Sequence, residues 1–304
     1  MMSTGKVFFP ILLATILHDR YSVKTEITLE RYASQIYRDT SVVPTQSAEL
    51  LKDATTIYTN NTTETRRYTY VAYIYLEEGG AVWRCGGSLI AEDLVLTAAH
   101  CLPGNDYFYG SVTIGGYETY DNEPQKNYKV SGFEIHPDYL ANGYPDNDFA
   151  IVKLDRCSGT RPVLLNRTGR DNIVDGAMVT VLGWEDTFND DGYEQYTTIQ
   201  ESFVYLNQEC EPWRSKNNLG TLTDNMLCTS LGVLSKPAIP KRGDSGGALL
   251  IKGDRPEEDV QIGVVSFGYD KPGRKDHVPT VHGNVGAAFH WITGVRDRLS
   301  QCSR

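Results

Sequence analysis

The chain has 304 residues, of which 40% are hydrophobic and 22% charged, a composition that excludes a disordered tail, a collagen-like fibre and a low-complexity linker. Acidic residues (39) outnumber basic residues (29), and the formal net charge is −10. Because nucleic-acid binding needs clustered Lys and Arg, and the sequence contains no such block, we expect no nucleic-acid partner.

Residues 1–18 have the pattern of a signal peptide. Their apolar segment, residues 7–17 (VFFPILLATIL), follows Lys6 and is interrupted by Pro10. It is shorter than the roughly 20 apolar residues of a membrane-spanning helix and matches the about 7–15 of a signal-peptide core. The alternatives are an N-terminal helix or a wrongly assigned start. We expect export, without stable insertion in a membrane.

Residues 19–56 are polar and show neither strand-like alternation nor glycine-rich turns, which is typical of a pro-segment or flexible extension. Three Asn-x-Ser/Thr sequences, at Asn60, Asn61 and Asn166, are candidate N-glycosylation sites and favour export. The expected product is a secreted, extracellular glycoprotein in which residues 57–304 form the folded part.

From about residue 57 the sequence alternates between turn formers and short runs rich in β-branched and aromatic residues. These runs are residues 70–76, 94–97, 149–154, 178–184 and 260–267. Many short strands separated by turns predict an all-β barrel or sandwich. Residues 287–299 instead place apolar side chains three or four positions apart, which predicts a C-terminal amphipathic helix.

The cysteines give little support to a metal or redox site, because none of them forms a CxxC pair. They are Cys85, Cys101, Cys157, Cys210, Cys228 and Cys302. An even number of cysteines in an exported chain indicates disulfides, although many pairings are open from the residues alone. We expect no metal and no cofactor.

Three local sequences carry candidate catalytic groups. His100 lies in TAAHC, Asp148 in DNDFAIVKL and Ser245 in the turn GDSGG. Each alone has an ordinary explanation, as a half-buried histidine, a strand cap and a turn serine. Together they are complementary, because an imidazole can take the proton of a serine hydroxyl while a carboxylate fixes the imidazole tautomer. Glycine allows a turn that aims backbone N–H groups at an oxyanion, and Gly243 and Ser245 are the candidates.

These three blocks, in this order, resemble the trypsin/chymotrypsin family of serine proteases. Further matches are HPDY at 136–139, DNMLC at 224–228 and VSFG at 265–268. The resemblance extends from about residue 57 to the C-terminus. It implies two six-stranded antiparallel β-barrels packed together, with a C-terminal α-helix, and a serine endopeptidase that works through an acyl-enzyme.

The resemblance assigns a role to each matched residue. His100 is the expected general base, Asp148 its orienting partner and Ser245 the nucleophile, with the N–H groups of Gly243 and Ser245 as the oxyanion hole. The expected substrate-binding residues are Ile239, Ser266, Phe267, Gly268 and Thr280.

The pocket that receives the P1 side chain, which precedes the scissile bond, is expected to prefer an apolar or small residue. Ile239 stands at the implied base of this pocket, where an acid would be needed to select Arg or Lys. Gly268 would leave the entrance open, and Thr280 would narrow one wall. The segment 266–268 would pair with the substrate backbone as an added strand.

The resemblance also implies activation by a new N-terminus that pairs with the acid before the nucleophile, here Asp244. Counting back places that terminus at Ile57, which follows Thr56 rather than Lys or Arg. Either an activator of different specificity cuts there, or the chain does not mature in the usual way. The dibasic pair Arg66-Arg67 lies too far downstream. The implied disulfides are Cys85–Cys101 and Cys210–Cys228, which leaves Cys157–Cys302.

Two functions remain open. One is an active, monomeric endopeptidase whose partners are polypeptide substrates and proteinaceous inhibitors. The other is a catalytically silent homologue that acts as a binding protein or inhibitor, which the degenerate N-terminus and altered pocket would favour. Because only catalysis requires all three triad residues jointly, their presence favours the endopeptidase.

Overall fold

The computed structural model describes residues 67–103, 109–115, 126–141, 145–169, 173–184, 187–188, 194–195, 199–206, 210, 222–231, 244–268 and 279–302. All of these residues belong to one compact unit, residues 60–304. The expected signal peptide and pro-segment lie outside the described residues. Within the described part of the chain, no helix has the length and hydropathy needed to cross a membrane.

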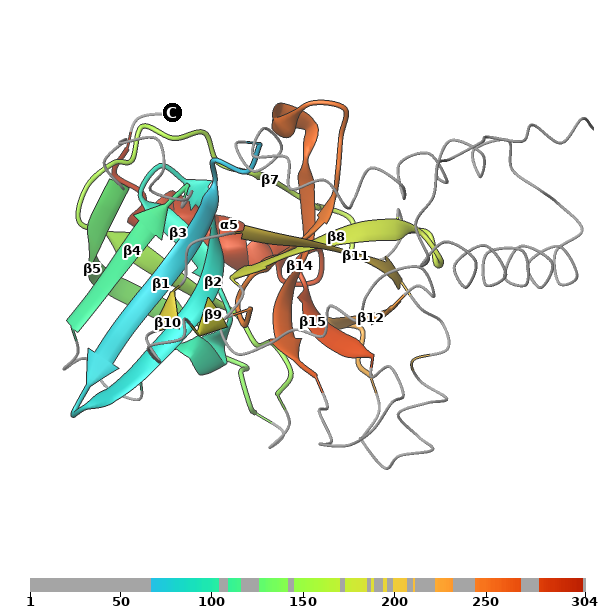
Figure 1. The fold of residues 1–304 in the computed structure, drawn as a ribbon, viewed down its shortest axis with the longest axis horizontal. Coiled ribbons are helices and arrows are strands. Elements are labelled where there is room, and N and C mark those ends of the chain that lie inside the picture. The colour runs from blue at the N-terminus through green and yellow to red at the C-terminus, as the bar shows by residue number, and fades with distance from the viewer. Residues whose placement is uncertain are drawn as a thin grey trace, which may run out of the picture. The chain divides into compact units, whose positions relative to one another are not determined.

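The first half of the unit is a closed barrel of six antiparallel strands, paired in the order β1-β2-β3-β6-β5-β4 (Figure 1). The strands are β1 (Val71–Glu78), β2 (Ala81–Ala91), β3 (Leu94–Thr97), β4 (Tyr109–Ile114), β5 (Lys126–Ile135) and β6 (Ala150–Leu154). In β1 the buried side chains of Ile74 and Leu76 alternate with partly exposed ones, as expected for a strand with one face on a core.

The second half is a curled sheet with the strand order β13-β8-β11-β12-β15-β14-β7 (Figure 1). The strands are β7 (Leu164–Leu165), β8 (Met178–Trp184), β11 (Ile199–Leu206), β12 (Met226–Leu231), β13 (Ala248–Ile251), β14 (Val260–Phe267) and β15 (Thr280–Asn284). A further antiparallel pairing joins β13 to β14, so six of these strands form a ring, and the short β7 is attached in parallel to β14. A separate two-stranded sheet contains β9 (Thr187–Phe188) and β10 (Glu194–Gln195).

The C-terminal helix α5 (Phe289–Leu299) buries Ile292 and Val295, so the apolar spacing in the sequence predicted its inner face correctly. Two short 3-10 turns, η1 (Ala99–Cys101) and η3 (Pro256–Glu258), complete the regular structure of the described residues. The predicted all-β fold with one C-terminal helix is confirmed.

Three disulfides join Cys85 to Cys101, Cys157 to Cys302 and Cys210 to Cys228. The family resemblance implies the first and the third, and the second is the pair that these two leave. The second closes a loop with a sequence separation of 145 residues and ties the segment after α5 to the chain after β6. It therefore holds the C-terminal helix on the first barrel.

A buried ion pair, here called the Arg67 cluster, joins the start of β1 to the start of β14. Asp259 is fully buried and forms a two-point ion pair with the Arg67 guanidinium. Tyr70 Oη donates to Asp259 Oδ2 over 2.9 Å, and the Gly253 N–H donates to Oδ1 over 3.0 Å. Every strong acceptor position of this carboxylate is therefore used, as a buried charge requires.

His282 on β15 is completely buried, and burial lowers its pKa to about 3 because the charged imidazolium loses its water. Its Nε2 lies 2.8 Å from Thr229 Oγ1, whereas Nδ1 has no hydrogen-bond partner among the described residues. In the unfolded chain the pKa of a histidine is about 6.5. As the pH falls below that value, the unfolded state binds a proton at His282 that the folded state does not bind. The free energy of unfolding therefore decreases.

Replacing His282 by Gln is therefore expected to weaken the acid dependence of stability. Between pH 6.5 and 4.5 the wild-type chain should lose about 2 kcal/mol through this group, since each full pH unit below the unfolded pKa is worth about 1.4 kcal/mol and the unfolded histidine is only half protonated at pH 6.5. Urea denaturation at several pH values measures the difference between variant and wild type. The exposed His290, changed to Gln, is the control. Equal pH dependence in H282Q and wild type would contradict the prediction.

Candidate active site

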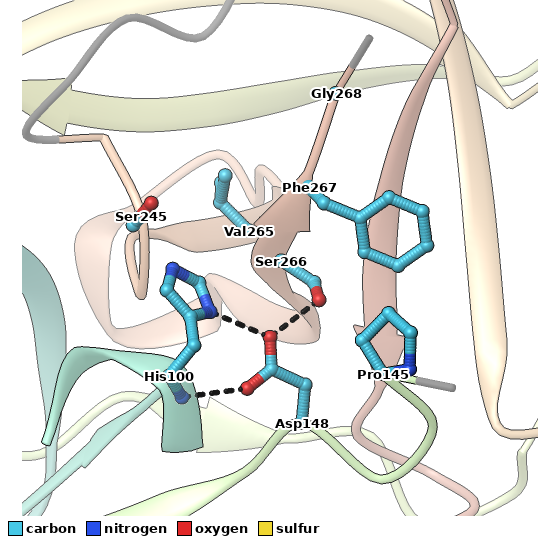
Figure 2. A pocket seen from close by; sticks show the side chains of 8 residues that line it. All are labelled: His100, Pro145, Asp148, Ser245, Val265, Ser266, Phe267 and Gly268. Atoms are coloured by element: carbon cyan, nitrogen blue, oxygen red, sulfur yellow. Dashed lines mark hydrogen bonds and ion pairs between the residues drawn. The ribbon is translucent and has the colours of Figure 1, made fainter. Parts of the chain in front are cut away.

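The candidate catalytic side chains come from both halves of the folded unit and line one cavity. His100 lies in η1 directly after β3, and Asp148 lies in the turn before β6. Ser245 lies in the turn before β13. The cavity is completed by Pro145 and by residues 265–268 at the end of β14 (Figure 2).

Asp148 is held against His100 by three hydrogen bonds. His100 Nδ1 lies 2.7 Å from Asp148 Oδ2, and the His100 backbone N–H donates to Oδ1 over 3.0 Å. Ser266 Oγ donates to Oδ2 over 2.5 Å. A carboxylate accepts only, so Nδ1 carries the proton and Nε2 is left free to act as a base. Ser266 thus lies behind Asp148, as the resemblance implies.

These contacts also keep Asp148 charged. Burial by itself raises the pKa of this carboxyl group, because only 2% of the residue is exposed. The hydrogen bond and charge of His100 and the hydroxyl of Ser266 outweigh burial, so the pKa of Asp148 lies below its ordinary value. The acid is therefore an anion at neutral pH and can stabilise a protonated imidazole.

Ser245 lies beside the Nε2 edge of the imidazole ring (Figure 2). Its hydroxyl makes no hydrogen bond to His100 in the described part of the structure. A single torsion, χ1, sets the direction of a serine hydroxyl, and staggered rotamers interconvert readily at a cavity wall. Catalytic hydrogen bonds commonly tighten only when substrate is bound, so the arrangement remains suited to proton transfer from Ser245 to His100.

The turn around Ser245 is packed tightly against β2. The Gly86 N–H donates to the Ser245 carbonyl over 2.7 Å, and the Gly246 N–H donates to Val265 O over 2.8 Å. Gly246 has φ +80°, and a Cβ there would lie 2.1 Å from Thr97 Oγ1. Only glycine fits this position, which explains the glycine that follows the candidate nucleophile.

The model of the trypsin family matches residues 57–292 of the chain. The chain belongs to the trypsin family of serine proteases. Trypsin of Phaedon cochleariae is 32% identical over 216 residues, which cover 68% of this chain and 77% of the relative. Chymotrypsin of the same organism is 30% identical over 235 residues, with coverage of 73% and 76%. Glucanase inhibitor protein 2 of Phytophthora sojae is 28% identical over 233 residues, with coverage of 75% and 74%. The chain is a serine-type endopeptidase by this membership.

Several expected site residues of the protease lie outside the described residues: Gly243, Ile239, Ile57, Asn60 and Asn61. The described ones can be placed. A Cβ on Gly183 would lie 2.0 Å from Asp244 Oδ1, so the Asp244 carboxylate lies against β8. Thr280 is buried on β15, and its Oγ1 lies 3.9 Å from the position of a Cβ on Gly268. Thr280 is therefore a neighbour of the cavity.

Asn166, the third glycosylation candidate, is 9% exposed. Its Nδ2 donates to the Gly169 carbonyl over 2.7 Å, and its Oδ1 accepts from Thr168. A glycan on Nδ2 would require this turn to open, so modification of the folded protease at Asn166 is disfavoured.

One group of potential metal ligands occurs in the described part of the protease, Glu92 with Cys157 and Cys302. Both sulfur atoms belong to a disulfide and cannot act as thiolate ligands. This group therefore provides no basis for a metal site.

Asp146, which opens the DNDFAIVKL block, was not singled out by the sequence analysis. It accepts hydrogen bonds from Thr223 Oγ1 (2.8 Å) and Asn225 Nδ2 (3.2 Å), and both donors precede β12 in the second half of the unit. The sequence signal was its place in the same block as Asp148. Its partners could not be found from the chain, because 77 and 79 residues separate them from Asp146.

Proposed function

We propose that the chain is a secreted endopeptidase in which Ser245 is the nucleophile, His100 the general base and Asp148 the residue that orients it. The proposal rests mainly on one observation: His100 Nδ1 lies 2.7 Å from the buried Asp148 carboxylate, in a cavity that Ser245 also lines. This arrangement leaves Nε2 as the basic atom nearest the serine.

The proposed reaction has two halves. Ser245 Oγ attacks the carbonyl carbon of the scissile peptide, and its proton passes to His100 Nε2. His100 returns that proton to the leaving amine, which departs and leaves an ester on Ser245. Water then attacks the ester carbon and gives one proton to His100, which passes it to Ser245 Oγ as the acid leaves. Asp148 stays ionised throughout and stabilises the imidazolium, while the N–H groups of Gly243 and Ser245 would bind the oxyanion.

For the substrate we propose an apolar or small P1 residue. Ile239 carries no charge to attract Arg or Lys, Gly268 leaves the entrance open and Thr280 narrows a wall. Phe267 would contribute apolar surface, and segment 266–268 would pair with the substrate backbone. Proteinaceous inhibitors would bind in the same place, and the protease would act as a monomer.

We also propose export and maturation by cleavage before Ile57, after which the new amino group would pair with Asp244. The N-terminal apolar segment supports export, as do the three disulfides, because disulfides persist in oxidising compartments. Residues 1–18 would be removed on export and residues 19–56 on maturation.

Labelling with a fluorophosphonate probe tests the proposed nucleophile. The chain should react after proteolytic processing, and the Ser245→Ala variant should not. Ser158, which is buried away from the cavity residues, provides the control variant Ser158→Ala. Processed wild type should also cleave an apolar-P1 peptide faster than an Arg-P1 peptide. Faster cleavage of the Arg peptide would contradict the pocket assignment.

The second candidate is a catalytically silent homologue that binds another protein. One relative, glucanase inhibitor protein 2 of Phytophthora sojae, is named as an inhibitor, which supports this candidate. So does the absence of a hydrogen bond between Ser245 and His100 in the described structure. If processed wild type and the Ser245→Ala variant are equally unlabelled, this second candidate replaces the first.

A further inference from the structure

The proposed triad is divided between two halves of the fold. His100 and Asp148 belong to segments of the first barrel, whereas Ser245 and Ser266 belong to the second sheet. A small displacement between these halves would change the distance from His100 to Ser245. Because misplacement by about 1 Å can lower a rate about a hundredfold, contacts that cross between the halves beside the triad matter for catalysis.

Asp146 makes such contacts two residues from Asp148. Its Oδ1 accepts from Thr223 Oγ1 over 2.8 Å, and its Oδ2 accepts from Asn225 Nδ2 over 3.2 Å. Asp146 is 9% exposed, so water competes little for these bonds. Each carboxylate oxygen is therefore bound to a different side chain of the opposite half.

The anchoring segment is itself fixed to the second sheet. The Asn284 N–H at the end of β15 donates to Asn225 O over 2.8 Å, and the Met226 N–H donates to Thr223 O over 3.1 Å. Asp146 thus binds a segment that is integrated into the β12–β15 pair.

On its other side, Asp146 is rigidly connected to Asp148. Asp146 Oδ1 also accepts the Asn147 N–H over 3.0 Å, and the Phe149 N–H donates to Asn147 O over 2.7 Å. Asn147 has φ +53°, the left-handed region that few residues other than glycine adopt. Asparagine adopts this region more readily than most residues, and the bond from the Asn147 N–H to the side chain of Asp146 fixes the turn in it.

We infer that Asp146 is a positioning residue for the reaction: its bonds to Thr223 and Asn225 hold Asp148, and with it His100, in register with Ser245 on the opposite half. This inference rests on the proposed function of the triad. Asp146 does not line the catalytic cavity, and it acts on Asp148 through the backbone turn.

The central test compares Asp146→Asn with a control that also crosses between the halves. In D146N an NH₂ group replaces one acceptor oxygen and faces either the Asn225 amide or the Asn147 N–H, so one of these two bonds is lost. Ser88 on β2 is also buried, and its Oγ donates to Gln261 Oε1 over 2.6 Å; Ser88→Ala removes this bond. D146N should lower kcat/KM about ten- to a hundredfold, mostly in kcat. S88A should lower the melting temperature with kcat/KM within about twofold of wild type.

Two further variants test the contact itself. Thr223→Val keeps the shape but removes one donor, and should lower kcat in the same direction as D146N. The double variant D146N/N225D reverses donor and acceptor across the second contact and should recover most of the lost activity. If the added N225D exchange does not reduce the loss of activity in D146N, the loss reflects a general structural effect and contradicts the positioning role.

The pH profile and a proton spectrum give readouts that a merely structural role would not move. When Asp148 is held less closely it stabilises the imidazolium less, so the acidic limb of kcat/KM should move to lower pH in D146N and also in Thr223→Val, which changes no charge. The other titratable groups facing this region are Tyr139, which the charge of Asp148 affects, and His136, which Asp138 and Asp146 affect. The variant His136→Asn, made in both the D146N and the wild-type chain, controls for a contribution of His136 to the pH profile.

The proton on His100 Nδ1 is hydrogen-bonded to the Asp148 carboxylate and should give a strongly deshielded NMR signal. This signal should weaken in D146N and persist in S88A. This signal needs no turnover. An unlabelled wild type would overturn the proposed function, whereas an unchanged signal, pH profile and kcat in D146N would overturn the role of Asp146.

Discussion

Replacing Asp148 by Asn is expected to lower kcat about 10⁴-fold, which is the size of effect known for this exchange in a serine-protease triad. All three groups that face Asp148 are donors: the His100 N–H, His100 Nδ1–H and the Ser266 hydroxyl. The NH₂ group of Asn would have to point at one of them. If it points at Nδ1, it selects the tautomer whose proton sits on Nε2, and the imidazole can no longer accept the proton of Ser245.

The measurement is kcat for an apolar-P1 peptide at neutral pH, together with a thermal melt to show that D148N is folded. Asp155→Asn is the matched control, because Asp155 is another aspartate of the first barrel that pairs with Arg156 at the surface. D155N should retain wild-type activity. A folded D148N within tenfold of wild-type kcat would refute the assigned role of Asp148.

Replacing Asp259 by Asn is expected to lower the free energy of unfolding by about 3–5 kcal/mol, since removal of one partner leaves a buried charge uncompensated. The Arg67 side chain is only 15% exposed and would keep its charge beside a neutral amide. The amide would also present an NH₂ group to the donors Tyr70 Oη–H and Gly253 N–H. The effect should appear in stability rather than in kcat, because no residue of the Arg67 cluster lines the catalytic cavity.

Urea denaturation measures this change. The control is Glu258→Gln, which breaks an ion pair with Arg255 at the exposed end of the same loop and should leave the midpoint nearly unchanged. The double variant R67M/D259L replaces the pair by apolar side chains and should be more stable than D259N alone. Equal midpoints for D259N and E258Q would show that the Arg67 cluster does not stabilise the fold.

The fold class and several strands could be predicted from local patterns, and β2 is instructive among the strands that were not. The runs at 94–97, 178–184 and 260–267 became β3, β8 and β14 with the same bounds. Strand β2 (Ala81–Ala91) was not among the predicted runs, since Gly86 and Gly87 interrupt its β-branched and aromatic residues. A Cβ on Gly86 would lie 2.9 Å from Gly247 Cα, so this glycine marks the close approach of β2 to the nucleophile turn.

The candidate triad was predictable for a different reason: each of its three residues lies in a contiguous block that is recognisable by itself. The long-range pairings that position the triad or stabilise the fold could not be predicted in this way. Thr223 supports Asp146 across 77 residues and Arg67 meets Asp259 across 192. Pairings at such separations depend on how the two halves pack, and no local pattern encodes them.

The Arg67 cluster also limits cleavage of the folded chain by proteases that cut after arginine. A protease that cuts after arginine must draw the guanidinium into a recognition pocket, and Arg67 has its guanidinium locked on Asp259 and on the Gly253 carbonyl. The bond after Arg67 is thereby protected from such cleavage for as long as the first barrel stays folded. This ion pair joins the start of β1 to the second sheet. It also makes the folded chain resistant to a cleavage that would remove the residues before β1.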